Sequence, residues 1–202
     1  MNPQDLWPGA NSSDQKILGL ASLFDLEFSI DWIQELSRAK ATTLLTTLEK
    51  ACQEGFLKKG DLGFFYFSDP KIQSRIKSTL PKDQLEVYHR KIAALMMTET
   101  PDNEQAILAA ANQLVHVSND IEGCRILLDA GNRYRKKGVS QKAFLCYDKA
   151  IHDLRDKEGR PENVLFIETV IGYSKERLSL DNSELTTSLL KEALTLAQRA
   201  CC

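Results

Sequence analysis

Apolar residues recur every three or four positions through most of this chain, which is the period of an amphipathic helix. Residues 1–12 are rich in Pro, Gly, Asn and Ser and are interpreted as a flexible lead. Three helices are expected after it. The third should run from about Ala41 to Glu54, where Gly55 ends it. In residues 56–67 the pattern changes from helical to extended on the two sides of a glycine-containing turn, which predicts a short β-hairpin.

Prolines mark the starts of the helices expected after the hairpin. Asp69-Pro70 supplies an N-cap and a first-turn proline, and Pro81 opens the next helix. Helical spacing resumes after Thr100-Pro101 and continues to the end of the chain. The last expected pair is Pro161 to about Leu178 and Asp181 to Ala200, in which Asp181 and Glu184 have capping-box spacing.

Small and aromatic residues in segment 130–151 have the spacing of a tetratricopeptide helix pair. Small residues allow the partner helix to approach closely, and an aromatic ring fills the space between the helices. In the last helix pair Ala193 occupies the position that Ala150 has in this pair, which indicates a repeat of about 40 residues. The predicted repeat-packing residues are Gly131, Tyr134, Gly138, Ala143, Tyr147, Ala150 and Ala193.

These patterns predict a mainly α fold in two parts. Three helices followed by a two-stranded hairpin form the layout of a winged-helix domain, which with two following helices should occupy residues 13–98. Tetratricopeptide-like antiparallel helix pairs should occupy residues 101–202. Two pairs leave an apolar face at the open end of the array, so a homodimer is one expected outcome.

The composition narrows the function classes. Charged residues make up 27% of the chain and hydrophobic residues 43%, and the net charge is −2, without the basic surplus of a general nucleic-acid binder. Neither a long apolar run nor a signal peptide is present, which predicts a cytoplasmic protein without membrane contact. The ending RACC directly after a helical pattern suggests a fragment of a longer protein.

Cysteines and histidines offer no recognisable chemistry. The five cysteines form no CxxC pair, and Cys52, Cys124 and Cys146 are interpreted as small core residues. The three histidines are far apart and lie in no metal-binding motif, and no nucleophile elbow or paired-carboxylate motif is present. We therefore expect no metal, no cofactor and no catalytic residue. An enzyme ranks third among the possible functions, after a binding scaffold and a DNA-binding regulator.

A run of cations is the sharpest charge feature. It can offset the helix dipole at a solvated turn, or it can dock an acidic partner or a phosphate. The candidate docking residues are Arg133, Arg135, Lys136, Lys137 and Lys142.

The third helix of a winged domain is the one that would enter a DNA groove. Here it carries only Lys50 against Glu49 and Glu54, which opposes contact with phosphates and argues against DNA binding.

Several segments between Lys16 and Met97 occur in the order found in one protein family. They are Ile17–Phe24, Phe28, Gly55-Phe56-Leu57, Phe65–Phe67, Ser78-Thr79-Leu80-Pro81 and His89-Arg90-Lys91-Ile92-Ala93. This order resembles the winged-helix region that follows the nucleotide-binding domain of bacterial STAND-type signal-transduction ATPases and related transcriptional regulators. The resemblance implies that tetratricopeptide-like repeats come next.

The chain departs from that family in identifiable places. Asp69 stands where the family commonly has a His after the last strand, and the repeat has Leu127, Ala130 and Arg155 in place of Trp, Leu and Pro. No GxxxxGK[ST] motif is present, so the chain has no P-loop with which to hold a triphosphate.

The function implied by this resemblance is binding and signal relay, with no catalysis by the chain itself. The expected partner is another protein, or a nucleotide-binding module of the same chain that lies outside this sequence. The alternative is a DNA-binding winged-helix transcription regulator with a helical dimerisation domain.

Overall fold

The computed structural model describes residues 7, 9–99, 103–177 and 184–200. Its chain is mainly helical with a small antiparallel sheet, and it divides into two compact units, residues 1–95 and 96–202. The division falls slightly before the boundary expected from the sequence, inside helix α6 (Lys82–Glu99).

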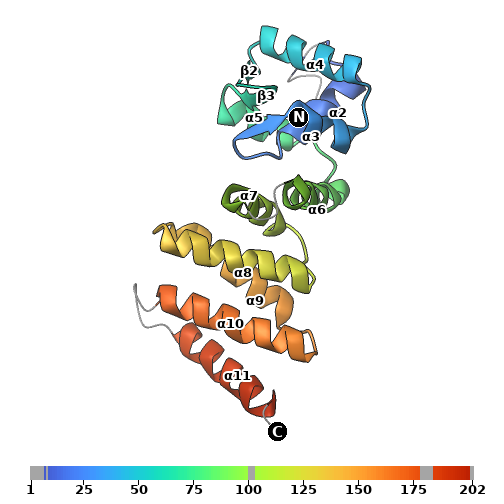
Figure 1. Cartoon of the computed structure of the whole chain (residues 1–202). Helices are drawn as coiled ribbons and strands as arrows, with labels where there is room; N and C mark the ends of the chain where they lie inside the picture. The colour runs from blue at the N-terminus through green and yellow to red at the C-terminus, as the bar shows by residue number, and fades with distance from the viewer. Residues whose placement is uncertain (1–6, 8, 100–102, 178–183, 201–202) are drawn as a thin grey trace. The chain divides into compact units, whose positions relative to one another are not determined.

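The N-terminal unit alternates helices with three short strands (Figure 1). The hairpin and the helices flanking it form as predicted, and one further strand pairs with the hairpin to give the order β1-β3-β2. The elements before α6 are α2 (Ser12–Ala21), β1 (Glu27–Ser29), α3 (Ile30–Ser37), α4 (Ala41–Gln53), β2 (Leu57–Lys59), β3 (Phe64–Phe67) and α5 (Pro70–Lys77).

Local capping explains where several of these helices begin and end. The Ser29 hydroxyl accepts hydrogen bonds from the amides of Asp31 and Trp32 at the start of α3, and Asp69 accepts one from Lys71 at the start of α5. Gly55 ends α4 with φ +78°, a conformation that glycine adopts without steric cost. The start of α5 and the end of α4 were both predicted from these residues.

Aromatic rings fill the core of the N-terminal unit. Phe28 on β1 pairs with Phe65 on β3, and their rings are stacked with centroids 6.0 Å apart. Trp7 is 4% exposed and packs against Phe56 at 5.5 Å. Burying such a side chain stabilises the fold by about 1.5–3 kcal/mol. The interpretation of residues 1–12 as a flexible lead therefore fails at Trp7, which belongs to the core.

The C-terminal unit consists of consecutive packed helices (Figure 1). From α7 (Glu104–Leu114) onward each helix packs on the next, and α10 (Arg160–Arg177) also packs on α8 (Ile121–Lys136), two helices back in the chain. The predicted Asp181 cap and the restart at Thr100-Pro101 lie outside the described residues. The helices of this unit that follow α6 are α7 (Glu104–Leu114), α8 (Ile121–Lys136), α9 (Ser140–Leu154), α10 (Arg160–Arg177) and α11 (Glu184–Ala200).

None of the helices that the structure describes is both long enough and apolar enough to cross a membrane.

Candidate functional site

The best-defined packing in the C-terminal unit surrounds Tyr147 of α9. Its side chain has no solvent exposure. A Cβ atom on Gly131 of α8 would lie 2.6 Å from a Tyr147 ring carbon, and one on Gly172 of α10 would lie 2.9 Å away. Both glycines are therefore needed for the ring to fit. One tyrosine thus joins three helices, and the predicted contact between Gly131 and Tyr147 is present.

The hydroxyl of Tyr147 reaches a polar environment at the edge of this packing. It donates a hydrogen bond to Asn132 Oδ1 at 2.9 Å. Burial raises the pKa of the Tyr147 phenol, and the guanidinium of Arg135 opposes the shift. The phenol therefore stays protonated and serves as a hydrogen-bond donor at neutral pH.

Gly138 was predicted as a repeat-packing residue, but it is exposed, and a Cβ atom there would meet no other atom within 4 Å. It instead sets the turn between α8 and α9. Its φ is +72°, its amide donates to Arg135 O, and the amide of Val139 donates to Tyr134 O at 2.9 Å. This pair of bonds is the Schellman motif, which ends a helix and satisfies its last carbonyls. It reverses the chain so that α9 packs back along α8.

The remaining predicted packing residues lie inside the unit. Ala143 and Ala150 are completely buried, Tyr134 is 6% exposed, and Ala193 on α11 is 5% exposed. Tyr134 also donates a hydrogen bond to Asn112 of α7 at 3.1 Å. Small residues on α9 thus lie where the helices approach, whereas Ala193 belongs to a separate contact on α11.

Most of the predicted cationic docking residues already have partners within the unit. Arg133 is paired with Asp129 at 3.0 Å and Lys137 with Glu104 at 3.2 Å. Lys142 lies over the Tyr134 ring, 5.4 Å from its centroid. Arg135 lies near Tyr147, and Lys136 is exposed. A docking role for these residues stays a prediction, and a partner would compete with these contacts.

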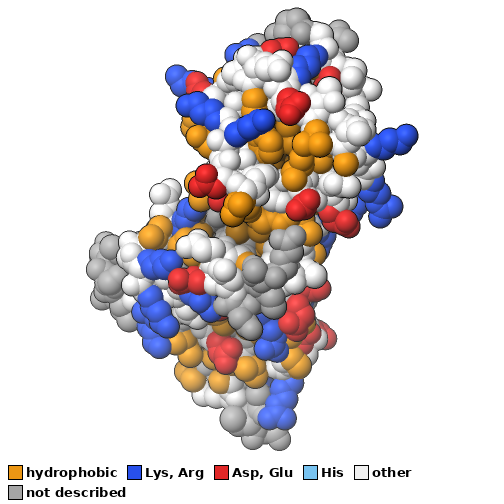
Figure 2. Space-filling view, turned by 45° about the horizontal axis from the view of Figure 1, so that its top comes forward, with side chains coloured by type: hydrophobic (Ala, Val, Ile, Leu, Met, Phe, Trp, Pro, Cys, Tyr) orange, Lys and Arg blue, Asp and Glu red, His pale blue; other side chains and the backbone are white. Residues whose placement is uncertain are grey.

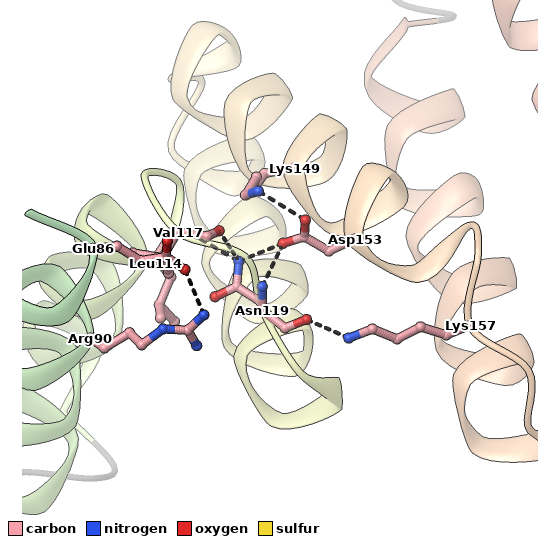
Figure 3. A network of polar contacts seen from close by, with 8 residues as sticks. All are labelled: Glu86, Arg90, Leu114, Val117, Asn119, Lys149, Asp153 and Lys157. Atoms are coloured by element: carbon pink, nitrogen blue, oxygen red, sulfur yellow. Dashed lines mark hydrogen bonds and ion pairs between the residues drawn. The ribbon is translucent and has the colours of Figure 1, made fainter. Parts of the chain in front are cut away.

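A polar network that sequence reasoning missed holds the α7–α8 connection against α9 (Figure 3). The side-chain amide of Asn119, which is 5% exposed, donates to Asp153 Oδ2 at 2.7 Å and to the carbonyls of Leu114 and Val117. The backbone amide of Asn119 donates to the same carboxylate oxygen at 2.9 Å. Asn119 therefore joins the end of α7 to the α7–α8 connection and holds both against α9.

Two lysines complete this network. Lys149 is ion-paired with Asp153 Oδ1 at 2.8 Å, and Lys157 donates to the backbone carbonyl of Asn119. Asn119 also lies against Gly123, where a Cβ atom would be 2.8 Å from Asn119 Oδ1. A sequence signal existed in the Asn-Asp pair before α8, but a buried role for Asn119 could not be inferred without its partners.

An open groove of about 920 Å³ lies between the α9–α10 turn and α11. Leu154, Phe166 and Leu196 supply its apolar lining, and Arg155 and Glu192 form an ion pair across it at 3.1 Å. Other charged side chains of both signs surround them. This mixed lining does not favour one chemical class of ligand.

The described cysteines are unsuited to nucleophilic chemistry. Cys124 and Cys146 are buried, and burial raises the pKa of their thiols to about 11 and about 12. Cys52 is half-buried and its pKa is also raised by burial. Within the part of the chain that the structure describes, no group of three or more His, Cys, Asp or Glu is placed to hold a metal ion.

Comparison of the chain with protein-family models, with curated proteins and with solved structures finds no match. The functional argument therefore depends on the packing and charges described above.

Proposed function

We propose that this chain is a non-catalytic protein-interaction and signal-relay region of a larger ATPase-linked signalling or transcriptional regulator. The observation that carries the proposal is the insertion of Tyr147 between Gly131 and Gly172. Such packing produces a stack of antiparallel helices, and stacks of this kind offer extended surfaces to partners.

The order of elements in the N-terminal unit supports a winged-helix interpretation. A helix precedes β1, two helices separate β1 from the hairpin, and β3 lies between the other two strands. This is the arrangement in which a small sheet packs beside a three-helix core. The half of the proposal that concerns a STAND-type regulator rests on this order together with the sequence resemblance.

The C-terminal unit supports a tetratricopeptide-like interpretation. Helices α8 and α9 form one pair, α10 and α11 form the next, and α10 returns to pack on α8. In a repeat array the first helix of each pair packs on the first helix of the neighbouring pair in this way. A partner would bind along the surface that the first helices of the pairs, α8 and α10, form together. No step of catalysis is assigned to this chain.

The proposal is tested with the nucleotide-binding module expected in the same reading frame. We expect this chain to bind that module with micromolar affinity, and the affinity to differ between its ATP and ADP states. Isothermal titration calorimetry measures both. The matched control is titration of this chain with Mg-ATP alone, which should give no heat of binding.

Two results would contradict the proposal. Stoichiometric ATP binding by this chain alone would assign nucleotide chemistry to it. A reading frame that encodes no further module would remove the relay and favour the alternative, a DNA-binding regulator.

One observation weighs against that alternative. Lys50 is the only basic residue of α4, and its ammonium group donates to Gly9 O at 2.7 Å and lies over the Trp7 ring. It is also 3.9 Å from Asp14. A phosphate contact would have to replace these interactions, so α4 is poorly suited to enter a DNA groove.

A further inference from the structure

The turn between β2 and β3 exposes a leucine almost completely. Leu62 is 98% exposed, so its side chain makes almost no contact within the protein. The amide of Phe64 donates to Asp61 O at 3.0 Å and closes the turn around Leu62 and Gly63. The fold therefore does not use this side chain for its own packing.

The backbone of this turn also disfavours leucine. Leu62 has φ +50° and Gly63 has φ +83°. Positive φ at both central residues is the geometry that strongly favours Asn, Asp or Gly at the first of them. Leu62 thus combines an exposed side chain with a strained backbone. Backbone strain of this kind concentrates at functional positions.

An apolar surface lies next to Leu62. The amide of Ile30 donates to Gly63 O at 3.2 Å, which joins the start of α3 to the turn. Ile30, Trp32 and Phe64 are half-buried, and the rings of Trp32 and Phe64 meet edge to face at 5.6 Å. Figure 2 shows hydrophobic side chains gathered on a face of the N-terminal unit in the upper part of the view, with charged side chains of both signs beside them.

Acidic side chains predominate around this surface. Asp31 follows Ile30, and Asp61 precedes Leu62, and both are exposed. Segments 25–37 and 60–67, which form the turn and its surroundings, contain no lysine or arginine. The basic residues nearest to it are on β2, where Lys58 lies opposite Tyr66 and Lys59 is paired with Glu49 at 4.0 Å. The acidic side chains beside Leu62 therefore favour a ligand that is apolar and cationic, which disfavours DNA and anionic membranes.

We propose that Leu62, with Ile30, Trp32 and Phe64 beside it and Asp31 and Asp61 at its edge, docks an amphipathic helix of a protein partner that carries lysines or arginines beside its apolar stripe. A helix surface offers holes between four side chains into which a single leucine fits. Cations beside such a hole meet the two carboxylates. This inference rests on the proposed interaction function and names one surface for it.

Fluorescence anisotropy with two synthetic helical peptides of about 18 residues tests the proposal. Both carry the same leucine stripe, and one has lysines beside it where the other has glutamates. We expect saturable one-to-one binding of the lysine peptide only. The variant Leu62→Asn should weaken it about tenfold, because a leucine anchor is lost. The double variant D31N/D61N should weaken it and reduce its salt dependence.

Stability distinguishes a lost anchor from a damaged fold. Asparagine accepts positive φ, so Leu62→Asn should unfold at the same urea concentration as the wild type or a higher one. Absence of saturable binding of the lysine peptide, or binding by Leu62→Asn within about twofold of the wild type, would overturn the proposal. Leu62-dependent binding of duplex DNA or of phosphatidylserine vesicles would overturn it too. If the nucleotide-binding module still binds in that case, only this surface assignment is lost.

Discussion

Tyr147 shows how much of the C-terminal unit depends on one side chain. Its ring is completely buried, and it occupies the space that the missing side chains of Gly131 and Gly172 leave. Glycine in a helix interior costs about 1 kcal/mol relative to alanine. Here that cost is offset by close packing of an aromatic ring, so each glycine is a packing residue.

Gly131→Ala should therefore destabilise the protein, although alanine is the better helix former. Its Cβ atom would lie 2.6 Å from the Tyr147 ring, which forces the ring or the helix to move. Overpacking of this kind costs about 1–3 kcal/mol in free energy of unfolding. Urea denaturation measures the loss. The control is Lys136→Ala on the same helix, which should change stability by less than about 0.5 kcal/mol. Equal midpoints for the two variants would mean that the contact is not tight.

Buried thiols should make the protein sensitive to alkali. The pKa values of Cys124 and Cys146 are raised by burial from 9.0 to about 11 and about 12. Above about pH 9 the unfolded thiols lose protons that the folded ones retain, so the unfolded state is favoured. The free energy of unfolding should fall as pH rises from about 9 toward these folded values, by about 1.4 kcal/mol per pH unit for each thiol and by several kcal/mol in all.

Urea titrations at about pH 8 and about pH 10.5 measure this effect. The double variant Cys124→Ala, Cys146→Ala should lose less stability between the two pH values than the wild type. An equal loss in both proteins would show that the thiols do not cause it.

Roles of single residues were predicted from the sequence where a residue type has one well-defined effect on the local backbone. Gly138 and Gly55 end helices because positive φ is favourable only for glycine there, and the helix end at Gly55 was predicted. Gly172 was missed because its role depends on a tyrosine in another helix. The cation Lys137 was recognised, but its partner Glu104 lies on another helix and could be found only from the folded arrangement. Asp129 lies four residues before Arg133 on the same helix, so that ion pair could have been found from the spacing alone.

At the scale of elements, the connection between α7 and α8 is held by side-chain bonds. The side-chain amide of Asn119 donates to Asp153 and to two backbone carbonyls. All its partners are acceptors, so this position requires a donor. The connection is therefore fixed relative to α9 although it is neither helix nor strand.

Asn119→Asp should break this network. A carboxylate at residue 119 would face the carboxylate of Asp153 and two carbonyl oxygens in a buried site, without a proton to share. We expect a loss of about 2–4 kcal/mol in free energy of unfolding at neutral pH. Urea denaturation measures it, and amide hydrogen exchange should show faster opening of α7. Asp156→Asn, at an exposed site, should have little effect. Wild-type stability for Asn119→Asp would contradict the bonding described.

Elements themselves were predicted unevenly. Long amphipathic helices such as α8 and α9 were recognised because their apolar positions repeat over several turns. The hairpin was recognised from its turn and its aromatic run. Strand β1 was missed because three residues, Glu27–Ser29, carry too little alternation to be read, and it forms only by pairing with β3.

At the scale of the whole molecule, a balanced charge limits the partners. The net charge is −2, and the one lysine of α4 is held by the chain's own N-terminal segment. We expect DNA binding that is weaker than about 1 μM at physiological salt, sensitive to salt and independent of sequence. A gel shift with nanomolar affinity that Lys50→Glu abolishes would instead support the winged-helix regulator. Glu49→Lys is the matched variant, and it should strengthen any non-specific binding.

The position of Tyr147 has a consequence for how the C-terminal helices unfold. Detaching α10 would expose the Tyr147 ring to solvent and remove the contact of α10 with α8. Loss of either α8 or α10 therefore weakens the packing of the other helix. The three helices α8, α9 and α10 should therefore melt in a single all-or-none step, as strongly coupled neighbours in a linear stack do. A ligand that binds only the intact stack would raise the melting temperature of all three helices together.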